Sequence, residues 1–62
     1  MRGTPMIDRR SSPLQLRLAA AAIRDEAAWM RRVGFEESAV DVVELFAASH
    51  ERRAWLLETS AA

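Results

Sequence analysis

The segment SPLQLRLAAAAIRDEAAWMRRVG, residues 12–34, has the start signal and the stop signal of one complete helix. Ser12 is a suitable N-cap, Pro13 suits the first helical position, and Gln15 stands three residues after the cap, as in a capping box. Gly34 supplies the left-handed residue that often follows a last helical turn. No Gly or Pro lies between these marks, and strong helix formers dominate. The sequence therefore predicts a helix from the proline to just before the glycine.

The apolar residues of this helix fall on two strips when they are placed at 100° intervals. The first strip repeats at spacings of four and three residues, which is typical of the seam of a helix that packs closely on another. The second strip lies roughly 140° away, and arginines fill most of the remaining side. Two strips predict two contacts, one inside a helical hairpin and one with something else. The first strip is Leu16, Ala20, Ile23, Ala27 and Met30, and the second is Leu18, Ala22, Trp29 and Val33.

A second helix is predicted to follow a short connection. Ser38 is the expected N-cap, with Asp41 three residues on, and a start at Glu36 is the alternative because acidic residues favour a helix N-terminus. Its pattern is more clearly amphipathic than that of the first helix. The apolar face comprises Phe35, Ala39, Val42, Val43, Leu45, Phe46, Leu56 and Leu57, and the polar face comprises Glu37, Asp41, Glu44, Ala48, Glu51 and Arg52.

Two residues near the end of this helix do not match its faces. Arg53 falls in the middle of the apolar face and Trp55 on the polar one. No Gly or Pro interrupts residues 36–58, so we favour one continuous helix, whose end would bring these two side chains to another subunit. A break near Ser49, followed by a short third helix over residues 50–58, is the alternative.

These elements predict an all-α fold, an antiparallel helical hairpin over residues 12–59. Residues 1–11 are expected to form a flexible N-terminal arm, and residues 60–62 a frayed C-terminus. A chain of 62 residues has a small core, and chains of this size are usually stabilised further by disulfides, a metal or association. Because the sequence has no Cys and one His, association is the source of stability that we expect. We therefore expect dimerisation into a four-helix bundle, since one patch then serves both partners.

The charges balance, with nine Arg, no Lys and nine acidic residues. A general attraction to nucleic acid or to anionic membranes is therefore not expected. The acidic polar face of the second helix also opposes binding to anionic lipid. No apolar run reaches the roughly 18 residues of a membrane span, and the N-terminal residues lack the apolar region of a secretory signal. A cytoplasmic location is the expectation.

No pattern in the sequence indicates catalysis. The serines beside the helices are explained as caps, and HExxH, ExxH and glycine-rich phosphate motifs are absent from the sequence. His50 has Glu51, Glu58 and Asp41 as candidate partners, but Glu51 is its neighbour at i+1, and such neighbours do not face each other on a helix. We expect His50 to be a surface or interface residue. We therefore expect no enzyme activity, no catalytic residues, no metal, no cofactor and no small-molecule substrate.

The leading hypothesis is a small protein–protein interaction module that acts as an accessory subunit, adaptor or regulator. Its partner would be itself, as a homodimer, or a larger protein. The alternative is a nucleic-acid-binding regulator, because arginine pairs at the start of the first helix and the end of the second would converge at one end of a hairpin dimer. The expected partner interface is Leu16, Ile23, Trp29, Met30, Val33, Phe46, Trp55 and Leu56, and the candidate phosphate contacts are Arg9, Arg10, Arg52 and Arg53.

Overall fold

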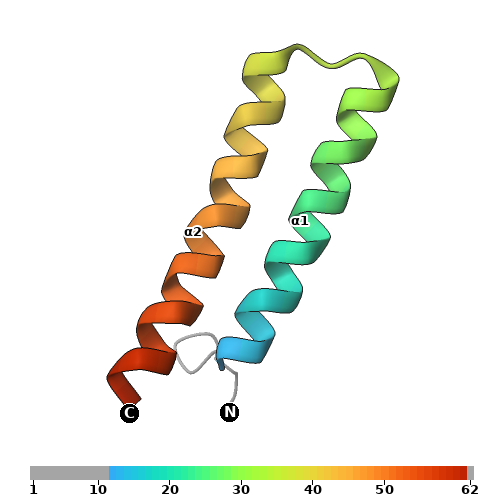
Figure 1. The fold of residues 1–62 in the computed structure, drawn as a ribbon. Coiled ribbons are helices and arrows are strands. Elements are labelled where there is room, and N and C mark those ends of the chain that lie inside the picture. Colours follow the sequence, from blue (N-terminus) through green and yellow to red (C-terminus); the bar gives the residue numbers. More distant parts are fainter. Residues whose placement is uncertain (1–11, 62) are drawn as a thin grey trace, which may run out of the picture.

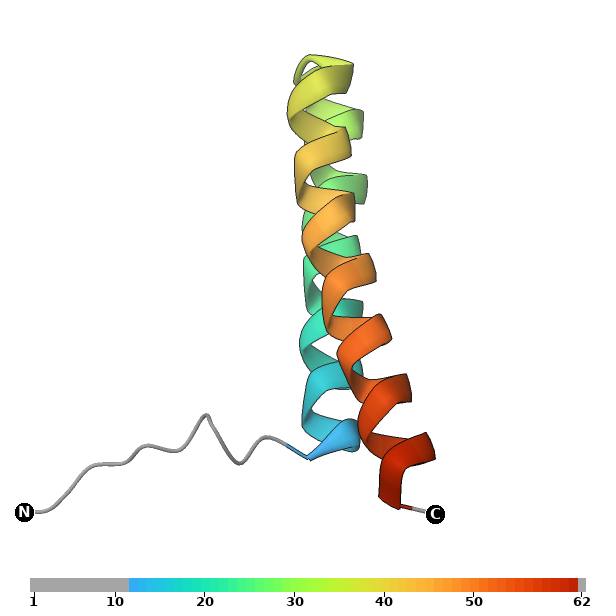
Figure 2. The same cartoon turned by 90° about the vertical axis from the view of Figure 1, so that its left-hand side faces the viewer.

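The computed structural model describes residues 12–61, which form two antiparallel helices joined by a short turn (Figure 1). Helix α1 spans Pro13–Val33 and helix α2 spans Glu37–Ala61. The helices lie side by side in Figure 1, and in the view turned by 90° α2 lies in front of α1, with the turn at one end (Figure 2). The predicted all-α helical hairpin is confirmed. The predicted N-terminal arm lies outside the described residues, and neither helix is long and apolar enough to cross a membrane.

The start of α1 is the capping box that the sequence predicted. The backbone N–H of Gln15 donates to Ser12 Oγ at 3.1 Å, and the backbone N–H of Ser12 donates to Gln15 Oε1 at 3.0 Å. Pro13 occupies the first helical turn, where its missing N–H leaves no bond unmade. Two of the N–H groups that a helix start leaves without partners are therefore satisfied by side chains.

The turn between the helices depends on Gly34, whose φ of 98° lies in the left-handed region. The N–H groups of Gly34 and Phe35 both donate to the carbonyl oxygen of Met30, at 3.1 and 3.0 Å. The Phe35 ring then packs against Trp29 with 5.8 Å between ring centroids. A side chain at residue 34 would be strained at this φ although open space surrounds it, so the glycine is needed for its backbone conformation.

Helix α2 begins at Glu37, and the predicted N-cap role of Ser38 is wrong. The carbonyl oxygen of Glu36 accepts the first bonds of the helix, from the N–H groups of Ala39 and Val40 at 3.0 and 3.1 Å. Ser38 therefore lies inside the first turn. The acidic residue at the start of the helix interacts favourably with the helix dipole, and the alternative start at Glu36 rests on the same effect.

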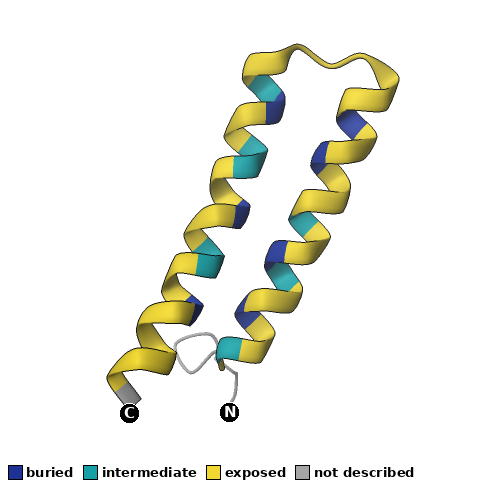
Figure 3. Cartoon of the chain, in the orientation of Figure 1, coloured by how far each residue is buried: buried dark blue, intermediate teal, exposed yellow. Residues whose placement is uncertain are grey.

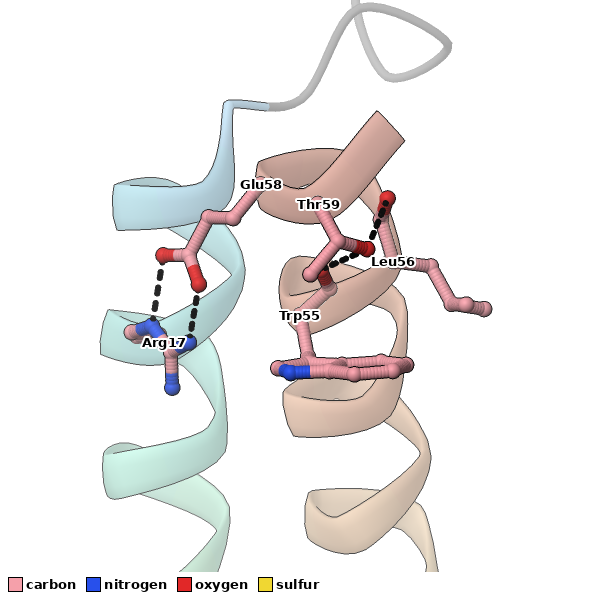
Figure 4. Close-up of polar contacts among 5 residues, drawn as sticks. All are labelled: Arg17, Trp55, Leu56, Glu58 and Thr59. Carbon is pink, nitrogen blue, oxygen red and sulfur yellow. Dashed lines mark hydrogen bonds and ion pairs between the residues drawn. The ribbon is translucent and has the colours of Figure 1, made fainter. Parts of the chain in front are cut away.

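Helix α2 continues without a break past Ser49, as expected, so the alternative of a short third helix is wrong. It also reaches Ala61, beyond the boundary at residue 59. The hydroxyl of Thr59 donates to the carbonyl oxygens of Trp55 and Leu56, at 3.0 and 3.2 Å (Figure 4). Fraying of the last residues concerns motion and stays a prediction.

The core is a narrow seam between the helices, and most of it is alanine. The buried residues lie on the sides of α1 and α2 that face each other (Figure 3). On each helix two alanines recur seven residues apart, and their small side chains let the two backbones approach closely. Val40 is the bulkiest side chain that is fully buried within the described residues. The buried residues are Leu16, Ala20, Ala27 and Met30 on α1, and Val40, Ala47 and Ala54 on α2.

The seam of α1 matches the sequence prediction, whereas that of α2 does not coincide with its apolar face. Four residues of the predicted α1 strip are buried, and Ile23 is half-buried. The α2 seam is rotated by roughly 120° from the centre of the predicted apolar face, most of which is exposed. Close approach of the backbones explains the difference, because Ala47 and Ala54 fit between the helices where Phe46 and Leu57 would not.

We expect Ala47→Leu to destabilise the hairpin by about 1–3 kcal/mol, because three further carbons in a closely packed seam force the helices apart. The neighbouring substitution Ala48→Leu adds the same atoms on an exposed side of α2 and should leave stability within about 0.5 kcal/mol of the original. Urea denaturation followed by helical circular dichroism, at one fixed chain concentration, measures both. Equal effects of the two substitutions would contradict the seam described above.

Candidate interaction surface

One side of the hairpin carries a row of ion pairs between the helices, which we call the Arg–Glu row. Arg17 donates to both carboxylate oxygens of Glu58, through Nη2 at 2.6 Å and Nε at 3.1 Å (Figure 4). Arg24 binds Glu51 in the same two-pronged way, at 2.8 and 3.0 Å. Arg31 bonds to two carboxylates. The row consists of Arg17, Arg24 and Arg31 on α1 and Glu37, Glu44, Glu51 and Glu58 on α2.

The two-pronged pairs shift the pKa values of their members. The hydrogen bond from Arg24 lowers the pKa of Glu51, and the hydrogen bond from Arg17 lowers the pKa of Glu58. These carboxylates are half-exposed, with 40% and 43% of their side-chain surface accessible. Solvent therefore screens the pairs, and their main effect is on geometry rather than on stability.

The Arg–Glu row fixes the register of the helices. Its members recur every seven residues on each helix and in opposite directions, so each pair repeats the alignment of the previous one. In this register Trp29 of α1 lies at the same height as Phe46 of α2, and Val33 lies at the height of Val42. Large apolar residues of the two helices are therefore brought to one level near the turn.

The opposite side of the hairpin is an apolar face. Placed at 100° per residue, its residues lie across the seam from the Arg–Glu row on both helices. The Trp29–Phe35 ring contact continues it into the turn. All six of its large members are exposed, from 40% for Leu57 to 61% for Phe46. The exposed residues of the apolar face are Trp29, Val33, Phe35, Val42, Phe46 and Leu57. Leu18 of the second α1 strip is also exposed, on the same side of α1 as Trp29 but far from the turn.

The polar residues of this face lie near its middle. Glu26 of α1 and Arg53 of α2 are exposed there, and neither makes an ion pair within residues 12–61. His50 is half-buried beside them, and its Nδ1 lies 2.8 Å from the carbonyl oxygen of Phe46. Since a carbonyl only accepts, Nδ1 is the donor in that bond. The apolar face thus has a bulky part near the turn and a polar group of both signs at its centre.

The residues predicted for the partner interface do not lie on one surface of the structure. Trp29, Val33 and Phe46 come together on the apolar face, as described above. The side chains of Leu16 and Met30 are buried against α2 and are therefore used inside the hairpin. The half-buried Ile23 lies at the edge of the seam.

Trp55 and Leu56 are exposed, but they do not belong to the apolar face. Trp55 lies on α2 on the side of the Arg–Glu row, and its ring does not point toward the Arg17–Glu58 pair (Figure 4). At 100° per residue, Leu56 lies on the side of α2 remote from α1. Both tryptophans are left exposed by the hairpin, at 45% and 56%, as the sequence led us to expect.

The candidate phosphate contacts are only partly described. Arg9 and Arg10 lie outside residues 12–61, so their predicted convergence with the end of α2 is not tested. Arg52 and Arg53 are exposed and project about 100° apart from α2. Neither of them pairs with Glu51 or Glu58 in the structure, because those carboxylates bind Arg24 and Arg17.

No catalytic or metal site is assembled by residues 12–61. They contain no group of three metal-ligating side chains, and no buried side-chain nitrogen or oxygen lacks a partner. An open depression on the outer side of α2 is lined by Leu45, Ala48, Ser49 and Arg52. These residues come from one helix only, so the depression encloses no ligand site.

Sequence reasoning missed the Arg–Glu row although its signal is present. Arg17, Arg24 and Arg31 are separated by seven residues, and so are Glu37, Glu44, Glu51 and Glu58. Matching heptad repeats of opposite charge on two antiparallel helices predict charge pairs that flank the seam. The same reasoning would have added Val42, Phe35 and Leu57 to the expected interface.

Comparison with protein-family models, with curated proteins and with solved structures finds no match for this chain.

We expect the stability of the hairpin to fall as the pH drops below about 4.5. The pKa values of Glu51 and Glu58 are lowered in the folded state, so their contribution is present above the unfolded-state value, about 4.3. It is lost as the pH falls through the lowered values. Urea midpoints at pH 6 and pH 3, at one chain concentration, measure the loss.

The double substitution Glu51→Gln with Glu58→Gln should reduce this fall in the urea midpoint. As a control, Asp25→Asn with Asp41→Asn also removes two acidic groups, but neither aspartate forms an ion pair within the described residues. The control should keep the original fall. An undiminished fall in the glutamine variant would show that these ion pairs are absent in solution.

Proposed function

We propose that this chain is a helical protein–protein interaction module, which acts as an accessory subunit, adaptor or regulator by packing its apolar face on helices of another polypeptide. The proposal assigns it no catalytic reaction and no cofactor, and it places the protein in the cytoplasm. The observation that supports it is the apolar face, where six large side chains are exposed together. Contiguous exposed apolar surface of this kind marks interaction sites.

The composition of the core also supports the proposal. Four of the seven buried residues are alanines, and an alanine side chain removes little apolar surface from water. The residues that would contribute most when buried, among them Trp29 and Phe46, are on the exposed face instead. Burying one such aromatic side chain contributes about 1.5–3 kcal/mol. A partner that covers the apolar face therefore adds apolar burial that the hairpin alone does not provide.

The shape of the face favours a helical partner. Two parallel cylinders present a groove between them, and helices pack in such grooves at interaxial distances of about 8–10 Å. The polar group formed by Glu26, His50 and Arg53 adds specificity, because a partner has to offer charges that match it. Aromatic residues and Arg are also the types most enriched at binding hot spots.

A photo-crosslinking experiment tests the proposal. A benzoylphenylalanine at residue 46, on the apolar face, should crosslink to a polypeptide in the cells that make the protein, and mass spectrometry identifies that polypeptide. The same group at residue 45, which is exposed on the outer side of α2, should give no such product. The substitution Val42→Glu should abolish the crosslink, because it places a charge in the interface. Equal yields at residues 45 and 46, or none at either, would refute the proposal.

The nucleic-acid alternative makes a different prediction. Arg17, Arg24 and Arg31 are paired with carboxylates, so within residues 12–61 three arginines are left to bind a polyanion, and the net charge of the chain is zero. We expect no retention on heparin at about 0.15 M salt. Retention that is lost in Arg52→Gln, with helicity unchanged, would instead favour nucleic acid as the partner.

A further inference from the structure

We propose that the polypeptide covering the apolar face is a second copy of this chain, and that the two hairpins pack with their turns at the same end. This rests on the proposed function, since it names the occupant of the same face. In this arrangement α1 of each copy packs on α2 of the other. Glu26 of each copy pairs with Arg53 of the other.

The size of the face suits a dimer of this kind. It is about two helix diameters wide and about 30 Å long, which gives on the order of 600 Å² for each copy. Two such faces bury about 1,200 Å², the lower limit of specific and stable interfaces. Two hairpins joined in this way form a four-helix bundle whose core contains the large apolar residues that the seam lacks.

Two symmetric arrangements bring the faces together. If the twofold axis runs along the helices, the turns lie at one end and each residue meets the partner helix at its own height. If the axis crosses the helices, the turns lie at opposite ends, and each helix packs on its own equivalent with the heights inverted. The distribution of residues along the face distinguishes the two.

The position of the large apolar residues along the face favours the arrangement in which the two turns lie at the same end. The register places Trp29, Val33, Val42 and Phe46 in the half of the face near the turn, as described above. With the axis along the helices, Trp29 meets Phe46 of the second copy and Val33 meets its Val42. With the axis across the helices, this bulky half would instead lie on the half that contains Arg53. The first arrangement therefore packs Trp29 on Phe46, whereas the second sets Phe46 near Arg53 and brings Leu57 of the apolar face against the bulky half.

Charge complementarity favours the same arrangement. Glu26 lies near the middle of the hairpin, so an axis across the helices would set it against Glu26 of the second copy, and like charges at an interface are costly. If the axis runs along the helices, Glu26 instead faces α2 of the second copy. There it lies about four residues, or 6 Å along the helix, from Arg53. An extended arginine side chain spans that offset. Both residues make no ion pair within residues 12–61, so the dimer supplies partners for both.

Charge exchange tests the pairing. Light scattering after size exclusion should give twice the chain mass of 7.0 kDa, and sedimentation equilibrium gives the dissociation constant. Glu26→Arg and Arg53→Glu should each weaken the dimer at least about tenfold, because each sets like charges together. The double variant should recover to within about threefold of the original. Asp25→Arg, the same change on the outer side of α1, is the control and should have little effect.

A distance measurement tests the orientation. The chain has no Cys, so Glu36→Cys places a single spin label in the turn of each copy. Turns at the same end should give a label-to-label distance within about 20 Å, or two helix diameters. Turns at opposite ends should give about 35 Å or more, close to the length of a 25-residue helix.

The outcomes separate this inference from the proposed function. A dimer whose labels lie about 35 Å apart, or whose double variant shows no recovery, would overturn the orientation and leave the interaction module intact. A monomer of low helicity that folds only when another polypeptide is added would overturn the second copy as occupant. A fully helical monomer at high concentration would also overturn the second copy as occupant, and the crosslinking experiment then decides the proposed function by itself. A dimer with close labels and recovery in the double variant supports both.

Discussion

The two helices approach each other closely along their alanines, and this spacing determines where the large apolar side chains lie. Ala20 and Ala27 of α1 face Ala47 and Ala54 of α2, and all four have at most 1% of their surface exposed. A seam this narrow has no room for a large side chain. The bulky apolar residues therefore lie to the side of the seam, and they form the apolar face. The exposure of that face follows from how the hairpin closes.

The Arg–Glu row complements the seam. Alanines alone specify register weakly, because a methyl group packs almost equally well one turn away. Three arginines that meet carboxylates at matching intervals remove that ambiguity, and two of them do so with paired hydrogen bonds of fixed geometry. Since these pairs are half-exposed, they select the alignment more than they stabilise it. The alignment in turn brings Trp29 level with Phe46.

Local signals let the sequence predict much of this fold, while contacts between the helices were harder to foresee. The capping box at Ser12 and the left-handed Gly34 each depend on a few neighbouring residues, so both were predictable. The α2 seam was not, because Val42, Phe46 and Leu57 form the most hydrophobic side of that helix and hydrophobicity alone selects it. The choice of Ala47 instead depends on the small residues of α1. Two residues of the expected partner interface, Leu16 and Met30, are instead buried between α1 and α2, because the close approach of the helices covers them.

The seam and the apolar face contribute differently to the stability of the hairpin. Because the seam buries mostly methyl groups, it supplies little of the free energy that opposes chain entropy. The larger apolar contribution is available only when the face is covered, so the stability of the hairpin and its association are linked by mass action. A seam of leucines would make a more stable hairpin, yet its wider spacing would move Trp29 away from Phe46 and divide the apolar face. Small residues between the helices therefore keep that surface continuous, at a cost in the stability of the isolated chain.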